Sequence, residues 1–82
     1  MKTESLLIEI LESVLGVRAL TQESRFLDVG GNSLNLVQVL NQIHERTGIA
    51  LSPRLFFDRS QSTVAALSAA IDSSLAETHL TV

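Results

Sequence analysis

Ser33 is the residue of this chain whose type and surroundings best suit chemistry. It follows Gly30, Gly31 and Asn32, and the paired glycines let the backbone turn tightly and leave room for a large partner molecule. Asn32 is a favoured N-cap residue, so a helix is predicted to begin at Ser33. The serine hydroxyl would then be exposed where a loop meets a helix, open to covalent modification. These four residues alone also fit an ordinary turn followed by a capped helix.

The rest of the sequence does not support catalysis by Ser33 itself. A Gly-x-Ser-x-Gly nucleophile elbow would need glycine where Asn35 stands. Of the two histidines, His44 lies about three turns along the predicted helix, too far to act as a base, and His79 lies near the C-terminus. The two histidines and the scattered carboxylates also lack the spacing of a metal site. We therefore expect neither catalysis nor a bound metal.

The helix predicted to carry Ser33 spans residues 33–47 and ends at Gly48. Its core-facing stripe follows the helical period and comprises Leu36, Val39, Leu40 and Ile43. A second face lies off this stripe and comprises Leu34, Val37, Gln38, Asn41 and Glu45. Single exposed apolar residues are common on protein surfaces. Leu34 and Val37 nevertheless lie within one turn of Ser33, which indicates a docking surface for a partner.

Two further long helices are predicted, one on each side of this helix in the sequence. The first spans residues 3–15, with Thr3 as N-cap and Gly16 as the stop. The last spans residues 62–75, with Ser62 or Thr63 as N-cap. Their apolar stripes are Leu7, Ile10, Leu11 and Val14 in the first helix, and Val64, Leu67, Ile71 and Leu75 in the last.

The connections between these helices complete the predicted fold. Residues 16–32 form a long loop, compatible with a helical turn near residues 22–26, that is expected to be held to the core by Val17, Leu20, Phe26, Leu27 and Val29. Ser52-Pro53 predicts the start of a short helix over residues 53–58. The predicted fold class is all-α: a small antiparallel four-helix bundle, with three main helices, one short helix and a long first loop. We expect a single domain over residues 1–82, with its core in about 3–76 and a flexible tail over 77–82.

Composition narrows the class of protein. Hydrophobic residues make up 45% of the 82, which predicts a packed core, and no cysteine is present to form a disulfide. The net charge of −3 argues against nucleic-acid binding. No apolar run approaches the length of a membrane span, and the N-terminus lacks a signal-peptide pattern. We expect a soluble cytoplasmic monomer. Met1 suggests a free-standing chain, and the alternative is a domain cut from a larger protein and given a start Met.

Two segments together resemble a known family. Phe26-Leu27-Asp28-Val29-Gly30-Gly31-Asn32-Ser33-Leu34 resembles the attachment motif of phosphopantetheine-dependent carrier proteins, in its peptidyl-carrier version with a double glycine. Leu55-Phe56-Phe57-Asp58, followed by Ser62-Thr63-Val64-Ala65-Ala66-Leu67, is similar to the passage from the third to the fourth helix of that family. The resemblance covers roughly residues 6–75. It implies an acyl-carrier-like bundle without catalytic activity of its own.

The resemblance also implies a cofactor and partners. Ser33 would carry 4′-phosphopantetheine, transferred from coenzyme A by a phosphopantetheinyl transferase, with Gly31 and Asn32 as supporting motif residues. The thiol of the arm would hold an aminoacyl, peptidyl or related acyl group as a thioester for non-ribosomal-peptide-type biosynthesis. A loading enzyme of the adenylation type and downstream condensation or tailoring enzymes would be the other partners. The family usually has Asp or His before the serine, whereas this chain has Asn32. Because Asn carries no negative charge, we expect weaker contact with a basic partner surface.

The family resemblance also implies which residues bind partners and which alternative functions must be considered. Leu34, Val37, Gln38, Asn41 and Phe56 are the expected partner-binding residues. The same helix in fatty-acid-type carriers commonly has acidic residues, so the neutral Gln38 and Asn41 favour a peptidyl carrier. The alternative within the class is an acyl carrier for fatty-acid or polyketide synthesis. The alternative from another class is a helical adaptor that is never modified, which would gain no mass from coenzyme A and a transferase.

Overall fold

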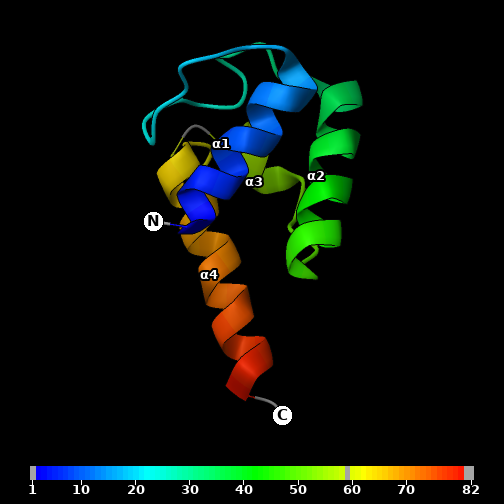
Figure 1. Ribbon diagram of the computed structural model, residues 1–82, viewed down its shortest axis with the longest axis vertical. Coiled ribbons are helices and arrows are strands. Elements are labelled where there is room, and N and C mark those ends of the chain that lie inside the picture. Colours follow the sequence, from blue (N-terminus) through cyan, green and yellow to red (C-terminus); the bar gives the residue numbers. More distant parts are fainter. Residues whose placement is uncertain (1, 59, 81–82) are drawn as a thin grey trace.

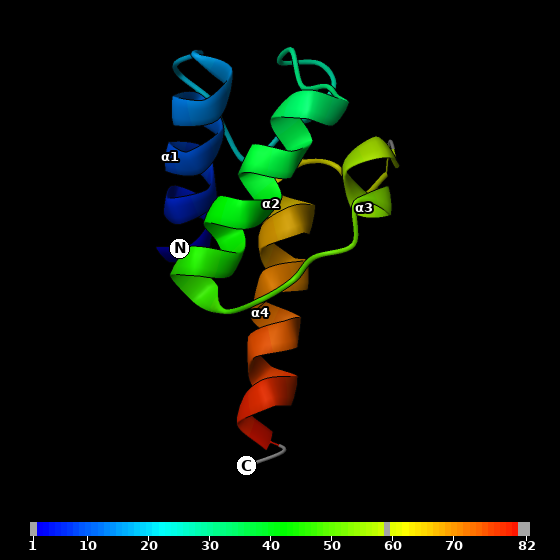
Figure 2. The same ribbon diagram turned by 90° about the vertical axis from the view of Figure 1, so that its right-hand side faces the viewer.

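The computed structural model describes residues 2–58 and 60–80, and side chains within 2–58 and 60–76. Its four helices are α1 (Lys2–Leu15), α2 (Ser33–Thr47), α3 (Arg54–Phe57) and α4 (Val64–Leu80). Helix α1 packs against both α2 and α4, and the short α3 lies beside the start of α4 (Figures 1 and 2). The all-α bundle with a long first loop is therefore confirmed.

One apolar core joins the four helices. Its buried side chains come from all four helices and from the connecting loops: Leu7, Ile10, Leu11, Phe26, Leu36, Val39, Ile43, Ile49, Leu51, Phe56, Val64, Leu67 and Ile71. These residues include most of the helical stripes read from the sequence, because burial of one face is what stabilises short helices. Leu40 was expected among them, but it is only partly buried at the edge of the core.

The helix ends show which capping signals were read correctly. Asn32 has extended backbone angles and its Oδ1 accepts a hydrogen bond from the Asn35 N–H at 3.0 Å, as an N-cap does. Gly48 ends α2 in the left-handed conformation, with φ 77°. Thr63 caps α4, because its Oγ1 accepts from the Ala66 N–H at 3.1 Å.

Thr3 was expected to be an N-cap, and this is wrong. Helix α1 already includes Lys2, so Thr3 lies within its first turn. Its hydroxyl hydrogen-bonds the Asp72 carboxylate and so joins α1 to α4. A threonine near the start of an apolar run fits either role, and the sequence does not show which partner lies opposite.

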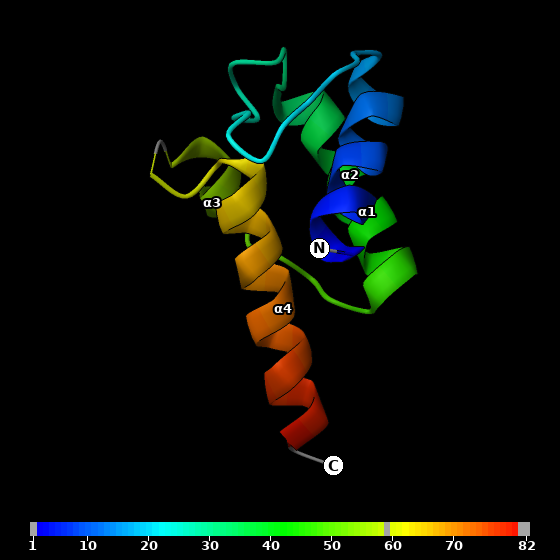
Figure 3. The same cartoon turned by 60° about the vertical axis from the view of Figure 1, so that its left-hand side comes forward.

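The short helix and the last helix differ from their expected bounds. Helix α3 covers only Arg54–Phe57, although Pro53 already has helical angles and the Arg54 N–H donates to Ser52 Oγ at 3.3 Å. Helix α4 continues to Leu80, so it projects below the other helices in Figures 1 and 3. Leu75 was expected in the core but is 37% exposed, because it lies on this projecting part. The predicted flexible tail falls partly on residues 81–82, outside the described residues.

The long loop is fastened to the start of α4 by backbone hydrogen bonds. The Phe26 N–H donates to the Ser62 carbonyl at 3.2 Å, and the Val64 N–H donates to the Ser24 carbonyl at 2.9 Å. Arg25 and Thr63 form an isolated antiparallel bridge there. Phe26 is buried as expected, but Leu27 is exposed, so it does not hold the loop to the core. No helix forms near residues 22–26, where the chain makes turns instead.

Within the described residues, no helix is long and apolar enough to cross a membrane.

Candidate functional site

Ser33 lies at the first position of α2 and is exposed to solvent. In the described part of the chain, no group hydrogen-bonds its hydroxyl. The side chain therefore has the exposure that a modifying enzyme requires. His44 is exposed near the other end of the same helix.

The two glycines before Ser33 are needed for different reasons. Gly30 has φ 98°, a conformation that residues with a side chain rarely adopt, and nothing lies within 4 Å of where its Cβ would be. Gly31 has no such angle, but a Cβ there would lie 2.5 Å from Cζ and 2.6 Å from Cδ2 and Cε1 of Phe26. Gly30 is thus required by backbone conformation and Gly31 by lack of space. The sequence shows the glycine pair but not this difference.

Several hydrogen bonds fix the loop that leads to Ser33. The Gly31 N–H donates to the Phe26 carbonyl at 2.9 Å, and the Val29 N–H donates to the Arg25 carbonyl at 3.1 Å. The Asn35 side-chain amide donates to the Gly30 carbonyl at 3.5 Å, which links α2 back to the loop. Asn35 was considered above only as the residue that rules out a nucleophile elbow, so its role in the loop was missed.

The start of α2 leaves backbone donors available next to Ser33. The Asn35 N–H is taken by the Asn32 side chain and the Leu36 N–H by the Asn32 carbonyl at 2.9 Å. Within the described residues, no acceptor is recorded for the N–H groups of Ser33 and Leu34. The positive end of a helix dipole with open N–H groups favours a phosphate. These residues therefore fit a phosphate ester at this serine.

The start of α4 is closed by the chain itself. Its Val64 and Ala65 N–H groups donate to the Ser24 and Gln22 carbonyls, each at 2.9 Å, and its Ala66 N–H donates to Thr63 Oγ1. The four orphan donors that begin a helix are thus largely satisfied by the first loop and the cap. Of these two helix starts, the one at Ser33 can accept an external anion.

The second face of α2 is exposed as expected. Leu34 is 82% exposed and Val37 58%, and the same face carries the exposed Gln38 and Asn41. Buried Leu36, Val39 and Ile43 occupy the opposite face of the same helix. The structure therefore separates a core face from a face that a partner can reach.

Phe56 was expected on the partner-binding face, and this is wrong. Its side chain is 0% exposed and its ring meets that of Phe26 edge to face, with centroids 5.2 Å apart. The next residue, Phe57, is 44% exposed. Adjacent helical residues point about 100° apart, so only one of the two can fill the core. The helix has a single turn, which leaves no periodicity from which to tell them apart.

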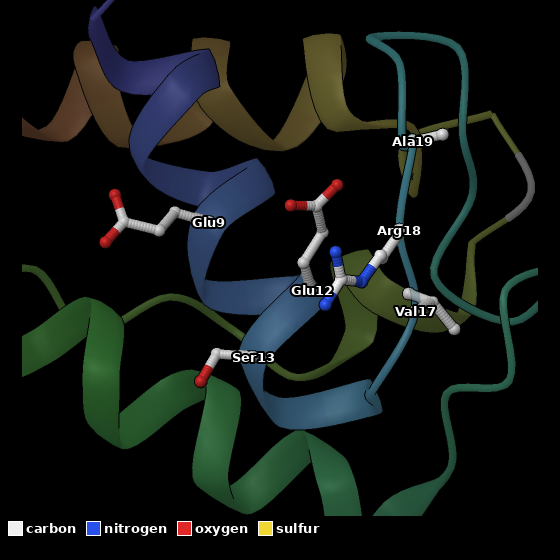
Figure 4. A pocket seen from close by; sticks show the side chains of 6 residues that line it. All are labelled: Glu9, Glu12, Ser13, Val17, Arg18 and Ala19. Carbon is white, nitrogen blue, oxygen red and sulfur yellow. The ribbon is translucent and has the colours of Figure 1, made fainter.

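A shallow hollow is present elsewhere on the molecule. It lies between α1 and the following loop, where Figure 4 shows its lining side chains: Glu9, Glu12, Ser13, Val17, Arg18 and Ala19. The Glu12 carboxylate accepts a hydrogen bond from the Leu20 N–H at 3.3 Å, so it holds the loop. Among the described residues, no three side chains are grouped as a metal site.

Comparisons with known proteins agree on the family. A family model described as "phosphopantetheine attachment site" matches residues 5–71. Over 96% of its length the chain is 34% identical to tyrocidine synthase 3 of Brevibacillus parabrevis, and over 88% it is 35% identical to a linear gramicidin synthase of the same organism. It spans only about 1% of the length of each synthase.

A solved structure shows the same fold. The chain matches one in the structure of the phosphopantetheine transferase Sfp in complex with coenzyme A and a peptidyl carrier protein, with a TM-score of 0.80 and 32% identity. The match covers 87% of this chain and 90% of that one. The chain belongs to the family of phosphopantetheine attachment domains. This family is defined by an attachment site for phosphopantetheine.

Proposed function

We propose that this chain is a peptidyl carrier domain whose phosphopantetheine arm is attached to Ser33. One observation carries the proposal: the exposed Ser33 begins a helix, and within the described residues neither its hydroxyl nor the N–H groups of Ser33 and Leu34 have a hydrogen-bond partner. The similarity to three synthases of peptide natural products, tyrocidine, gramicidin and bacitracin, supports the peptidyl type. The neutral partner face formed by Gln38 and Asn41 supports it further.

The chain's own residues present the hydroxyl and receive the arm. Ser33 Oγ forms a bond to the phosphorus of coenzyme A that bears the pantetheine, the adenosine-bisphosphate half leaves, and the serine proton passes to a base of the transferase. Asn32 holds the helix start, where the N–H groups of Ser33 and Leu34 favour the new phosphodiester. When attached, the arm supplies a terminal thiol that holds the cargo as a thioester. Leu34 and Val37 provide an apolar surface for partner enzymes.

The remaining features of the proposal concern the domain and its setting. We place a single carrier domain over residues 1–82, with its core in about 3–76; the buried side chains between Leu7 and Ile71 support this. Its partners would be a phosphopantetheinyl transferase, as for the carrier in the Sfp complex, a loading enzyme of the adenylation type, and condensation or tailoring enzymes. It would act as a monomer in the cytoplasm, where coenzyme A is available.

Intact-mass spectrometry tests the attachment. We expect the chain, incubated with coenzyme A and a promiscuous phosphopantetheinyl transferase, to gain the mass of one phosphopantetheine. Ser33→Ala should gain none, while its helical circular dichroism stays unchanged because Asn32 still caps α2. A wild-type chain without any mass gain would instead be an unmodified adaptor.

A loading experiment then tests the type of carrier. The modified chain is offered to aminoacyl-adenylating enzymes and, separately, to enzymes that load fatty-acid or polyketide units, and the thioester is detected by mass. The proposal predicts loading by an aminoacyl-adenylating enzyme. Loading only with malonyl or fatty acyl groups would assign the chain to the acyl carriers.

A further inference from the structure

We propose that Phe26 is a positioning residue for the modification of Ser33, acting through Gly31. The inference rests on the proposed attachment at Ser33 and adds a residue to it. Phe26 lies seven positions before the serine and is 1% exposed. It cannot touch an incoming enzyme or coenzyme A directly, so any effect on the reaction must pass through the loop.

Phe26 holds Gly31 in two ways at once. Its carbonyl accepts the Gly31 N–H at 2.9 Å. Its ring fills the space beside the Gly31 Cα so closely that an added Cβ would overlap three ring atoms, at 2.5–2.6 Å. Carbon atoms in contact are ordinarily about 3.5–4.0 Å apart. The position of Gly31 is therefore set by the ring beneath it.

The Phe26 ring cannot easily give way. It meets Phe56 edge to face, with centroids 5.2 Å apart and an interplanar angle of 82°, and it meets Phe57 in the same manner at 6.3 Å and 80°. Its own N–H is held by the Ser62 carbonyl at 3.2 Å. The ring thus sits between the loop, α3 and the segment before α4, which lie together in Figure 3.

Along the chain, one residue, Asn32, separates Gly31 from Ser33. Asn32 must keep its extended backbone, with φ −148°, for its side chain to cap α2. A shift of Gly31 would tilt Asn32 and so change the position of the Ser33 hydroxyl relative to the docking face on α2. Reactions between bound partners are sensitive to such displacements, since a misplacement of about 1 Å can cost 100-fold in rate. Docking through Leu34 and Val37 should be affected less.

The test adds a side chain at position 31 and then removes the Phe26 ring that this side chain would overlap. Gly31→Ala should lower kcat for phosphopantetheine transfer at least tenfold, with the KM for the carrier changed about twofold or less. Phe26→Val removes all three overlapping ring atoms. The double variant Phe26→Val/Gly31→Ala should therefore react faster than Gly31→Ala, although it is less stable. Rates are measured at a temperature where circular dichroism shows each variant folded.

Gly30→Ala is the matched control. This substitution is strained by its φ of 98° and meets no atom within 4 Å, so adding Phe26→Val should not restore its rate. Rescue of both glycine variants, or of neither, would overturn the proposal. A wild-type chain that is not modified at Ser33 would overturn the proposed function instead, so the two failures are distinguishable.

The proposal can still be tested if one of the single variants does not fold. If Gly31→Ala does not fold, the double variant is compared with Phe26→Val alone, and the two rates should agree within about twofold. A drop of tenfold or more in the double variant would contradict the proposal. If Phe26→Val does not fold, Phe26→Leu replaces it, because the flexible leucine side chain can turn away from Gly31.

Discussion

Helices α2 and α4 begin in opposite ways, although each has a polar N-cap residue. The first N–H groups of α4 are taken by the Ser24 and Gln22 carbonyls of the long loop, whereas, within the described residues, the N–H groups of Ser33 and Leu34 at the start of α2 have no acceptor. Helix α4 also buries Val64, Leu67 and Ile71, while α2 exposes Leu34 and Val37 on one face. One helix is closed by its own chain and serves stability. The other keeps its start and one face available for partners.

The largest expected effect contrasts the two helices by truncating one leucine in each. Leu67 of α4 is 0% exposed, so Leu67→Ala should lower the free energy of unfolding by about 2–5 kcal/mol. Leu34 of α2 is exposed, and Leu34→Ala should change the free energy of unfolding by about 0.5 kcal/mol or less. Urea denaturation followed by circular dichroism measures both. Similar losses from the two variants would contradict the division of roles.

The exposed face of α2 should matter to partners more than to folding. Val37→Asp places a charge in an apolar contact and should slow loading by the cognate enzyme at least tenfold, which is about 1.4 kcal/mol. Its melting temperature should stay within a few degrees of wild type, as for most surface changes. Because Gln38 and Asn41 are neutral, added salt should weaken loading only slightly.

Two results would change this interpretation of α2. If Val37→Asp unfolds the chain, Val37 belongs to the core. If the variant folds and is loaded at the wild-type rate, partners dock elsewhere, and Phe57 is the next residue to test because it is 44% exposed. Ser5→Ala, at an exposed position on α1, is the control and should leave both stability and loading nearly unchanged.

The N-caps provide a smaller and more specific contrast. Thr63→Ala and Asn32→Ala each remove a side-chain acceptor from a helix start and should each cost about 1 kcal/mol in stability. Only Asn32→Ala should also slow the modification of Ser33, because it loosens the helix start that presents the hydroxyl. Thermal denaturation and transferase rates, measured on both variants, check this. Equal transferase rates in the two variants would argue against a role for the α2 cap.

The smallest expected effect lies in the turn that precedes α4. Hydrogen bonds from the Ser60 hydroxyl, at 2.7 Å, and from the Ser60 N–H, at 2.9 Å, hold the pKa of Asp58 below its ordinary value of 3.8. Ser60→Ala should raise this pKa, as an NMR titration would detect, and Ser5→Ala on α1 should not. A lowered pKa stabilises the fold above the unfolded-state value, and this contribution is lost as the pH falls through the folded-state pKa.

The sequence predicted the parts of the fold that depend on local signals. Helix α2 has the predicted bounds because Asn32 and Gly48 are unambiguous capping residues. The exposure of Leu34 and Val37 followed from the helical period alone. Ser33 could be singled out because the glycine pair, the cap and the apolar face all lie within a few residues of it.

The remaining features depend on contacts between distant segments. Nothing in the sequence shows that the long loop closes the start of α4, since these hydrogen bonds involve only backbone groups. The overlap between Phe26 and a side chain at position 31 is likewise a matter of packing. Leu75 keeps the helical period but lies beyond the end of the bundle, so periodicity predicted burial that the fold does not provide.

The most direct test of the account is a tryptic peptide map of the modified chain. Cleavage after Arg25 and Arg46 gives the peptide 26–46, in which Ser33 is the only residue with a hydroxyl side chain. After incubation with coenzyme A and a phosphopantetheinyl transferase, we expect this peptide alone to gain the mass of one phosphopantetheine. The same mass on any other peptide, or an unmodified 26–46 peptide, would contradict the assignment of the open start of α2 as the attachment site.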